Sequence, residues 1–306
     1  MKKLTEGRKM FLSVMVIFAI YAVTFILFED YDRYYIIPFK ETSDWHLLIF
    51  SIVVMIGLGV LLLRYARRMD ERISREQADK ENQMRRELTQ NIAHELKTPV
   101  ASILGYTETI LEHPDMADDT RQQFVKRTQS QAQRLTALLQ DLSTLNRMDY
   151  AADNFAMERI DVSTIVKDIV QETALAASGK HINVKNALPQ DIIVKGNQSL
   201  IYSIFRNLID NAINYSGEGT TIQIEATEKD GRWDFTFADN GVGIADEHLP
   251  RIFERFYRID KGRSRALGGT GLGLAIVKNA VLLHGGNIKA MPAQGGGLRY
   301  EFSLKK

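Results

Sequence analysis

The stretch LTQNIAHELKTPV, residues 88–100, places a histidine next to a carboxylate. Its apolar residues recur every fourth position, at Leu88, Ile92 and Leu96. This spacing predicts a helix with one buried stripe, from which His94, Glu95 and Thr98 point into solvent. The zinc motif HExxH is excluded, because Thr98 occupies the place of its second histidine. The pair is an ordinary solvated surface pair unless a phosphate donor site elsewhere in the chain gives the histidine a chemical role.

Three asparagines in the second half of the chain share one face of a predicted helix. Asn207, Asn211 and Asn214 occupy positions i, i+4 and i+7, so their amides point the same way. Asparagine is a mediocre helix former. The three amides are therefore either an exposed polar face or ligands for a metal ion and phosphates.

Two glycine-containing stretches follow the asparagines. DNGVGI, residues 239–244, comes directly after a predicted strand, and its carboxylate is either part of a simple turn or an acceptor for an amino group of a ligand. GGTGLGL, residues 268–274, opens an apolar helix, where bare amides and a helix N-terminus suit a phosphate. The spacing matches neither the P-loop nor the dinucleotide-binding pattern. The order and spacing of the three stretches together are more specific than any one of them.

The composition excludes several classes of function. The chain has 306 residues and a formal charge of +1, from 39 Lys+Arg against 38 Asp+Glu, so nothing indicates a nucleic-acid partner. It contains no cysteine, which excludes disulfides, thiolate nucleophiles and cysteine zinc sites.

The histidine-bearing helix is expected to form a helical hairpin over residues 88–150. A loop is predicted at residues 112–119, where His113 and Pro114 interrupt the periodicity. The second helix carries an apolar stripe made by Phe124, Val125, Leu135, Leu138, Leu139, Leu142, Leu145 and Met148. Two helices cannot bury these faces alone, so a homodimer that forms a four-helix bundle is expected. Pro99 is expected to kink or loosen the first helix.

After a linker at residues 151–154 the pattern becomes mixed, which predicts one α/β domain over residues 155–306. Helical periodicity appears at residues 162–177 and 200–213. The alternation typical of strands appears at residues 221–227, 233–238 and 298–304. The chain is therefore expected to be a multidomain protein.

Two uncharged runs precede these domains and are predicted to be transmembrane helices. The first, residues 10–28, is long enough at about 1.5 Å per residue to cross a hydrocarbon core of roughly 30 Å. The second, residues 47–63, is flanked by Trp45 and Tyr65, aromatic residues suited to the two membrane interfaces. A cleaved signal peptide is the alternative for the first run, but no small-x-small cleavage site follows Phe28.

Basic residues beside both runs predict a multi-pass protein of the inner, cytoplasmic membrane with both termini in the cytoplasm. This topology assigns residues 1–9 to the cytoplasm, residues 29–46 to a short extracytoplasmic loop and residues 64–87 to a helical linker. The loop is too short to fold into a ligand-binding domain. The expected partners in the membrane are its lipid and a membrane-embedded sensory protein, through which a stimulus would enter.

With these stretches in order, the chain resembles the membrane-bound sensor histidine kinases of bacterial two-component systems. HELKTP at residues 94–99 is similar to the phosphoacceptor box of that family, and NLIDNAINYS at residues 207–216 is similar to its asparagine box. DNGVGI and GTGLGLAI are similar to its two glycine boxes, and IFERFYR at residues 252–258 resembles the phenylalanine box of its ATP lid. The resemblance covers residues 87–306.

The resemblance implies an ATP-binding α/β sandwich of the kind shared with gyrases and heat-shock chaperones, with ATP and Mg²⁺ as cofactors. Asp239 would contact adenine, Asn211 would hold Mg²⁺ and Arg258 would meet the γ-phosphate. His94 would be the nucleophile, with Glu95 on the proton of the other imidazole nitrogen. The nucleotide contacts that the resemblance implies are Asn207, Asn211, Asn214, Tyr215, Asp239, Gly241, Gly243, Ile244, Arg258, Gly269, Thr270, Gly271, Leu272 and Gly273.

In the family the phosphoryl group passes from the histidine to an aspartate of a cognate response regulator. A threonine four residues after the histidine orients the water that hydrolyses the regulator's phosphoaspartate, and Thr98 occupies that place. A non-catalytic membrane scaffold that binds ATP as a structural ligand is the rival interpretation, and the intact His94, Glu95 and Asn211 argue against it. A chaperone or topoisomerase subunit shares the fold but lacks a histidine-bearing hairpin ahead of the ATP domain.

One position departs from the family pattern. The asparagine box usually carries a lysine seven residues after its first asparagine, and this chain has Asn214 there. A neutral amide cannot replace a cation near phosphates. Either basic residues of the lid supply the charge or the affinity for the nucleotide is lower. These lid residues are Lys261, Arg263 and Arg265.

Overall fold

The computed structural model describes residues 44–150, 155–260 and 269–306. It divides into two compact units, with the boundary between Arg86 and Glu87. The predicted segments 1–9 and 10–28, and most of the predicted loop at residues 29–46, lie outside the described residues.

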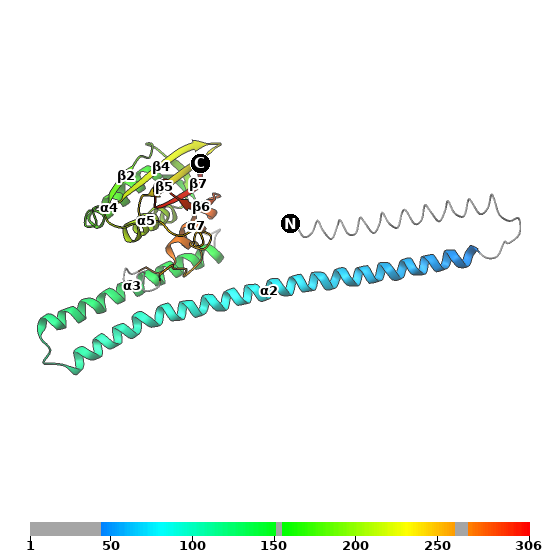
Figure 1. The fold of residues 1–306 in the computed structure, drawn as a ribbon, viewed down its shortest axis with the longest axis horizontal. Coiled ribbons are helices and arrows are strands. Elements are labelled where there is room, and N and C mark those ends of the chain that lie inside the picture. The colour runs from blue at the N-terminus through cyan, green and yellow to red at the C-terminus, as the bar shows by residue number, and fades with distance from the viewer. Residues whose placement is uncertain (1–43, 151–154, 261–268) are drawn as a thin grey trace. The chain divides into compact units, whose positions relative to one another are not determined.

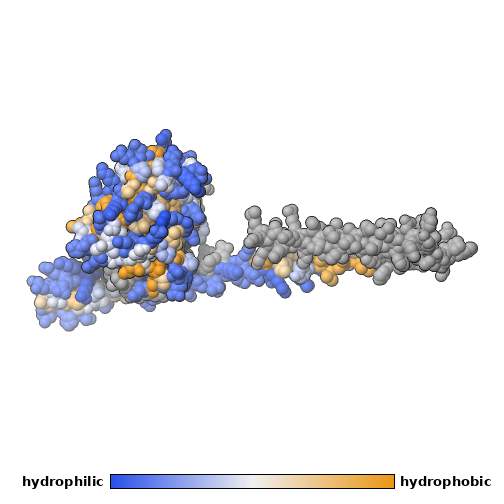
Figure 2. Space-filling view, turned by 45° about the horizontal axis from the view of Figure 1, so that its top comes forward, coloured by the Kyte–Doolittle hydropathy of each residue, from blue (hydrophilic) through white to orange (hydrophobic). Residues whose placement is uncertain are grey.

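Helix α2 runs from Asp44 to Glu112, so it begins inside the segment predicted as a loop. It includes the predicted second span and linker and continues through Pro99, which does not end it. In the first unit, the apolar side chains between Ile52 and Leu63 are largely exposed (Figure 2). Across the described residues, no helix has the length and apolar character that crossing a membrane requires.

The second unit begins with the predicted helical hairpin, which the structure confirms (Figure 1). Helix α3, from Asp118 to Tyr150, returns antiparallel to the end of α2. The Arg121 guanidinium closes the turn by donating hydrogen bonds to the carbonyls of Pro114 at 2.8 Å and Met116 at 3.3 Å. The buried residues of α3 all belong to the predicted stripe: Leu138, Leu145 and Met148.

A five-stranded sheet forms the scaffold of the following α/β domain, with the strand order β2-β4-β5-β7-β6 (Figure 1). Its strands are β2 (Asn183–Asn186), β4 (Thr221–Lys229), β5 (Arg232–Asp239), β6 (Ile288–Pro292) and β7 (Leu298–Lys305). Only the β2–β4 pair within this sheet is parallel. A separate antiparallel pair joins β1 (Glu158–Asp161) to β3 (Ile193–Gly196).

Three helices of this domain pack together and bury the apolar side of the sheet: α4 (Val162–Ser178), α5 (Gln198–Tyr215) and α7 (Gly273–Leu283). Alternate residues of β5 are buried, as expected for a sheet with one covered face. Phe205 of α5 contacts Phe235 and Phe302, with ring centroids 5.5 and 5.6 Å away. The predicted α/β sandwich is confirmed.

Two residues at the ends of α5 and α7 fix these helices to each other. Asn197 caps α5 by accepting a hydrogen bond from the Leu200 amide at 3.2 Å. The buried His284 ends α7, and its Nε2 accepts the Asn197 amide at 3.0 Å while its Nδ1 lies 2.6 Å from the carbonyl of Ala280. These bonds require a neutral imidazole, and burial lowers the pKa of His284.

Candidate active site

The predicted nucleophile lies on the surface of α2. The side chain of His94 is 64% exposed, and its Nδ1 lies 4.0 Å from Oε1 of Glu95. The ring therefore turns Nδ1 toward the carboxylate, and Nε2 lies on the opposite side of the ring. The separation is longer than a hydrogen bond, so a small movement would bring the two groups into contact.

One helical turn later, the hydroxyl of Thr98 donates a hydrogen bond to the carbonyl of His94 at 3.2 Å. Bonds of this kind let a threonine satisfy its hydroxyl within a helix. The same hydroxyl stays half-exposed beside the histidine, because Thr98 follows it by one turn on the same face.

The other oxygen of Glu95, Oε2, accepts two guanidinium groups. Arg134 of α3 donates from Nη2 at 3.4 Å, and Arg258 of the α/β domain donates from Nη2 at 3.1 Å. Arg258 also donates to the carbonyl of Gly269 at 2.6 Å, and its side chain is only 5% exposed. The carboxylate next to His94 therefore touches a residue predicted to meet a γ-phosphate.

Two nitrogens of that arginine are suited to bind an anion. Nε and Nη1 of Arg258 are buried and have no hydrogen-bond partner among the described residues. A buried guanidinium with unpaired N–H groups is costly, because each group loses its water without replacement. Phosphate oxygens would satisfy both nitrogens, so the site fits the polyphosphate that the sequence predicts.

The three predicted amides of α5 are half-buried along one face of the helix. Asn207 donates from Nδ2 to the carbonyl of Ser203 at 2.8 Å, and Asn211 donates from Nδ2 to the hydroxyl of Tyr300 at 3.1 Å. These bonds fix the amide planes and leave each side chain an acceptor oxygen, the ligand type that Mg²⁺ prefers. In the part of the chain that the structure describes, no cluster of three acidic, histidine or cysteine side chains forms another metal site.

Asp239 lies buried at the end of β5, as predicted. Its Oδ1 accepts the amide of Gly241 at 2.9 Å, and burial raises the pKa of its carboxyl. A Cβ atom at Gly297, where φ is +91°, would collide with the carbonyl and side chain of Asp239. The carboxylate is thus fixed by close backbone approach on both sides.

The DNG turn packs against the end of α5. Val242 donates its amide to the carbonyl of Ser216 at 3.0 Å, and a Cβ at Gly241 would collide with the same residue. Gly243 has a φ of +63°, while Ile244 packs against the domain core. The turn therefore lies beside the predicted asparagine helix and the half-buried Tyr215.

The glycine-rich loop reaches both the hairpin and the asparagine helix. Thr270 donates its hydroxyl to Oδ2 of Asp141 on α3 at 2.8 Å and accepts the amide of the buried Leu272 at 3.2 Å. Gly271, with φ of +73°, accepts the amide of Phe256 at 2.8 Å. A Cβ at the first residue of α7, Gly273, would come within 2.5 Å of Oδ1 of Asn207. The three predicted stretches and Arg258 thus meet in one region.

Comparison with known proteins agrees with this arrangement. The profile described as "His Kinase A (phospho-acceptor) domain" matches residues 84–151, and the one described as "Histidine kinase-, DNA gyrase B-, and HSP90-like ATPase" matches residues 196–306. The sensor-like histidine kinase SenX3 of Mycolicibacterium smegmatis is 36% identical over 220 residues, which are 72% of this chain and 57% of that protein. The chain belongs to the sensor histidine kinases of bacterial two-component systems.

Further relatives of this histidine kinase extend the agreement. The sensor histidine kinase WalK of Bacillus subtilis is 34% identical over 229 residues, 74% of this chain and 37% of WalK. The solved structure of Acinetobacter baumannii histidine kinase AdeS shares the fold with a TM-score of 0.58 at 24% identity, over 69% of this chain and 97% of AdeS. The structure of full-length ShkA, solved in complex with AMPPNP, matches with a TM-score of 0.53 at 25% identity, over 71% of this chain and 45% of ShkA. The matches thus span about half or less of the curated relatives' length.

Several residues that hold the site of this histidine kinase in place were not predicted from the sequence. They are Arg134, Asp141, Tyr300 and the ion pair between Arg255 and Asp149, whose Nη2 and Oδ1 lie 2.7 Å apart. A single arginine or aspartate on a charged helix gives no pattern by which to find it. Tyr300 looked like one more apolar position of a strand, although its hydroxyl orients Asn211.

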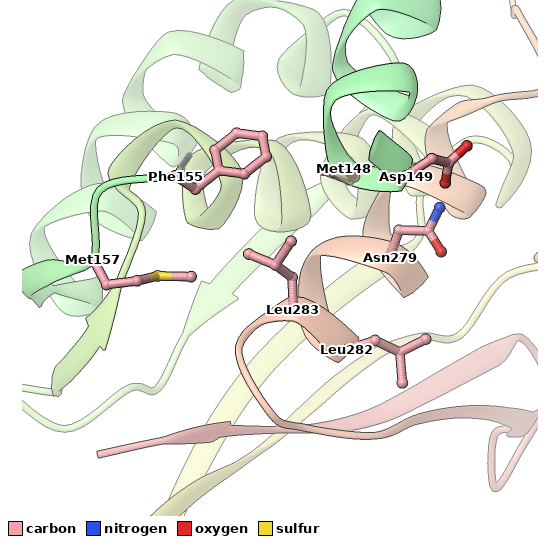
Figure 3. Close-up of a pocket in the computed structure, with 7 residues that line it drawn as sticks. All are labelled: Met148, Asp149, Phe155, Met157, Asn279, Leu282 and Leu283. Atoms are coloured by element: carbon pink, nitrogen blue, oxygen red, sulfur yellow. The ribbon is translucent and has the colours of Figure 1, made fainter. Parts of the chain in front are cut away.

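A cavity of about 600 Å³ lies where the end of α3 meets α7 (Figure 3). Figure 3 shows that its lining comes from α3, from the segment that leads into the ATPase domain and from α7. The residues are Met148, Asp149, Phe155, Met157, Asn279, Leu282 and Leu283. None of the predicted site residues lines it, so it is a packing gap between the two parts and not the nucleotide site of this kinase.

Proposed function

We propose that this chain transfers the γ-phosphoryl group of ATP to Nε2 of His94 and then to an aspartate of a response regulator. The contact of Arg258 with Glu95 carries this proposal. Arg258 uses Nη2 to bind Glu95, the residue next to His94, and its buried Nε and Nη1 remain suited to phosphate oxygens. Arg258 therefore connects the phosphate-accepting His94 to the proposed binding site of ATP.

On the side of the phosphoryl donor ATP, the predicted residues carry groups suited to adenine, to the phosphates and to Mg²⁺. The Asp239 carboxylate is an acceptor for the adenine amino group, and the loop from Gly269 to Gly273 offers backbone amides to the phosphates. Asn211 and Asn207 would present amide oxygens to Mg²⁺, which would neutralise phosphate charge as in other phosphoryl transfers. The solved complex of the related ShkA with AMPPNP supports ATP as the nucleotide.

On the acceptor side, Nε2 of His94 supplies the electron pair for the new N–P bond. The bond between the γ-phosphorus and the bridging oxygen breaks, and ADP leaves with that electron pair. The imidazole thereby becomes cationic, and its Nδ1 proton faces Oε1 of Glu95, which accepts or orients it. Positioning and charge neutralisation account for most of the rate enhancement in such a step.

Thr98 has a separate proposed role in the dephosphorylation of the response regulator. Its hydroxyl lies one turn from His94 on the face that a response regulator would approach. There it would orient the water that hydrolyses the phosphoaspartate of the regulator. The chain would then act both as a kinase and as a phosphatase of the same partner.

We also propose that the chain works as a homodimer. The hairpin leaves large apolar side chains exposed in a single chain: Val100, Leu104, Leu111, Val125 and Leu139. A second hairpin would bury them in a four-helix bundle. At about 25 cal/mol per Å² of apolar surface, burial of such a stripe favours association.

The membrane location is proposed from the sequence pattern. Residues 10–28 and 47–63 carry no charge, and the apolar side chains from Ile52 to Leu63 are exposed to whatever surrounds α2. Lipid would cover such side chains. A multi-pass protein of the cytoplasmic membrane follows, with a membrane-embedded partner or the short loop as the entry for a stimulus.

The test is incubation of the full chain in detergent micelles with [γ-³²P]ATP. The acid-labile ³²P label on the protein is then measured. The unaltered chain should be labelled, and His94→Gln should bind nucleotide yet incorporate no label. His113→Gln, at an exposed histidine in the turn of the hairpin, is the matched control and should be labelled normally. Label that persists in His94→Gln would overturn the proposed acceptor. Nucleotide binding without any label in the unaltered chain would favour a non-catalytic scaffold.

A further inference from the structure

Glu95 needs to be held if it is to serve His94. A glutamate side chain has several rotatable bonds, and fixing it costs about 1.5–2 kcal/mol of conformational entropy. Its Oε1 must nevertheless face Nδ1 of His94, which now lies 4.0 Å away. Some group must therefore bind the other oxygen and restrict the carboxylate.

Arg134 is placed to do this from within the hairpin. Its Nη2 lies 3.4 Å from Oε2 of Glu95, on the carboxylate oxygen away from the imidazole. The side chains of Arg134 and Glu95 are only 12% and 13% exposed. A shielded pair of this kind differs from a surface salt bridge, because loss of one partner leaves the other charge poorly solvated.

Arg258 binds the same oxygen but belongs to the ATPase domain. Its contact with Glu95 therefore exists only while that domain rests against the hairpin. Arg134 and Glu95 lie on α3 and α2, the two helices of the hairpin, so their contact does not depend on the position of the ATPase domain. The two arginines have different tasks, although they bind one oxygen.

We propose that Arg134 is a positioning residue, which holds the Glu95 carboxylate with Oε1 toward Nδ1 of His94 during phosphoryl transfer. This rests on the proposed function, in which Glu95 accepts or orients the Nδ1 proton while Nε2 attacks phosphorus. Arg134 itself touches neither the nucleotide nor the imidazole in this scheme. Its loss should slow the chemical step and leave ATP binding intact.

The test measures the autophosphorylation rate at saturating [γ-³²P]ATP, the KM for ATP and the melting temperature of the full chain. Arg134→Gln should lower the maximal rate about tenfold or more, which is part of the roughly 10²- to 10⁴-fold contribution of a general acid–base group, and should change the KM by less than about twofold. Arg134→Lys keeps a cation without the planar fork and should recover part of the rate. Arg127→Gln, at an exposed arginine of the same helix, is the matched control and should leave both parameters unchanged.

The double variant Glu95→Gln/Arg134→Gln separates positioning from a structural role. If Arg134 acts through Glu95, the double variant should be no slower than Glu95→Gln alone. Rate losses that multiply would overturn the proposal, as would a rise in KM without a change in the maximal rate. A fall in melting temperature that accounts for the loss of rate would also overturn it. A Glu95→Gln chain with the unaltered rate would remove the basis for positioning and still leave His94→Gln as the independent test of the acceptor.

Discussion

The acceptor side and the nucleotide side of this kinase are built in opposite ways. His94 lies on the surface of a single helix, and its Nδ1 lies 4.0 Å from Oε1 of Glu95. Asn211 donates a hydrogen bond to the hydroxyl of Tyr300 on β7, and Asp239 accepts the amide of Gly241 in the turn that follows β5. One side presents an exposed imidazole, and the other holds its groups partly or fully buried.

This difference fits the partners that each side would serve. An acceptor must meet a nucleotide and then a regulator, so its reactive nitrogen has to stay accessible. A nucleotide site must hold one ligand in one orientation, and preorganised groups lower the cost of doing so. Substitutions on the nucleotide side should therefore lower stability or the affinity for ATP. Substitutions on the acceptor side should instead change one of the proposed reactions without the other.

The largest effect is expected on stability, at the close approach of Gly297 to Asp239 on the nucleotide side. Gly297→Ala combines a φ of +91° with a collision against Asp239, and should lower the free energy of unfolding of the ATPase domain by about 3 kcal/mol or more. Gly295→Ala is the matched control, because its φ of +89° is similar but nothing lies within 4 Å of the added atom. Thermal unfolding should show a clearly larger drop for Gly297→Ala. Equal drops would mean that the close approach to Asp239 contributes nothing.

Asp239→Asn should lower the affinity for ATP about 10- to 100-fold, because a hydrogen bond to a charged group contributes about 1.5–3 kcal/mol. Asp234→Asn, on the same strand but paired with Arg232 at the surface, should leave the affinity unchanged. Calorimetric titration with a non-hydrolysable ATP analogue measures both. The hairpin dimer should survive either change, and a dimer that dissociates in Asp239→Asn would contradict the assignment of this residue to the nucleotide.

The same carboxylate predicts a pH dependence. Burial raises the pKa of Asp239, so the carboxylate is protonated at a higher pH than an ordinary aspartate. Only the ionised form accepts two hydrogen bonds without donating one. The KM for ATP should therefore rise on acidification earlier than an unperturbed aspartate would predict, and this rise should be absent in Asp239→Asn.

On the acceptor side, Thr98→Ala should separate autophosphorylation from the proposed phosphatase reaction. Autophosphorylation should stay within about twofold, whereas dephosphorylation of the regulator should fall about tenfold or more, as expected for the loss of a group that orients water. Thr107→Ala removes a similar bond, from a hydroxyl to the carbonyl of Ile103 at 2.9 Å, and serves as the control. Equal losses of both reactions in Thr98→Ala would mean that the bond to His94 is only structural.

A smaller effect is expected at the position that departs from the family pattern. Asn214→Lys should lower the KM for ATP several-fold, because a cation near phosphates contributes about 1 kcal/mol after screening. Steady-state kinetics at several ATP concentrations test this. A higher KM would indicate that basic residues of the lid already occupy the space, and an unchanged KM would indicate that residue 214 does not face the nucleotide.

The smallest effect concerns stability far from the reacting groups. Burial holds the pKa of His284 below its ordinary value of 6.5, so the unfolded chain binds the proton more readily. The free energy of unfolding should therefore decrease as the pH falls from about 6.5 toward the folded pKa, and level off below it. His284→Gln should flatten this slope in thermal unfolding, whereas the exposed His113→Gln should not. An unaltered slope in His284→Gln would show that the imidazole binds protons equally in the folded and unfolded states.

The predicted elements are those whose periodicity is long or strongly apolar. The hairpin, α4, α5, β4, β5 and β7 were all expected at nearly their observed positions. The short strands β1, β2, β3 and β6 were missed, because four or five residues do not establish an alternation. Their pairing is decided by contacts with distant strands, such as Val184 with Ile222.

The candidate site was predictable where a motif carries it and not where tertiary contacts do. His94, Asp239 and the glycine-rich loop stand in recognisable local patterns. Arg134 and Asp141 do not, because their importance comes from what they touch on another element. The sequence predicts which groups react, but the groups that hold them depend on packing between helices.

Pro99 gives the long helix α2 a further property. Proline has no amide hydrogen, so the carbonyl of Glu95 lacks its usual partner four residues on. The hydrogen-bond ladder of α2 is therefore interrupted at one joint, which lies at the turn from Glu95 to Pro99, although the helix continues. Amide hydrogen exchange should be fastest near this joint and slow again on either side of it. A turn that opens at little cost can present the same imidazole first to a nucleotide and then to a protein without melting the helix that carries it.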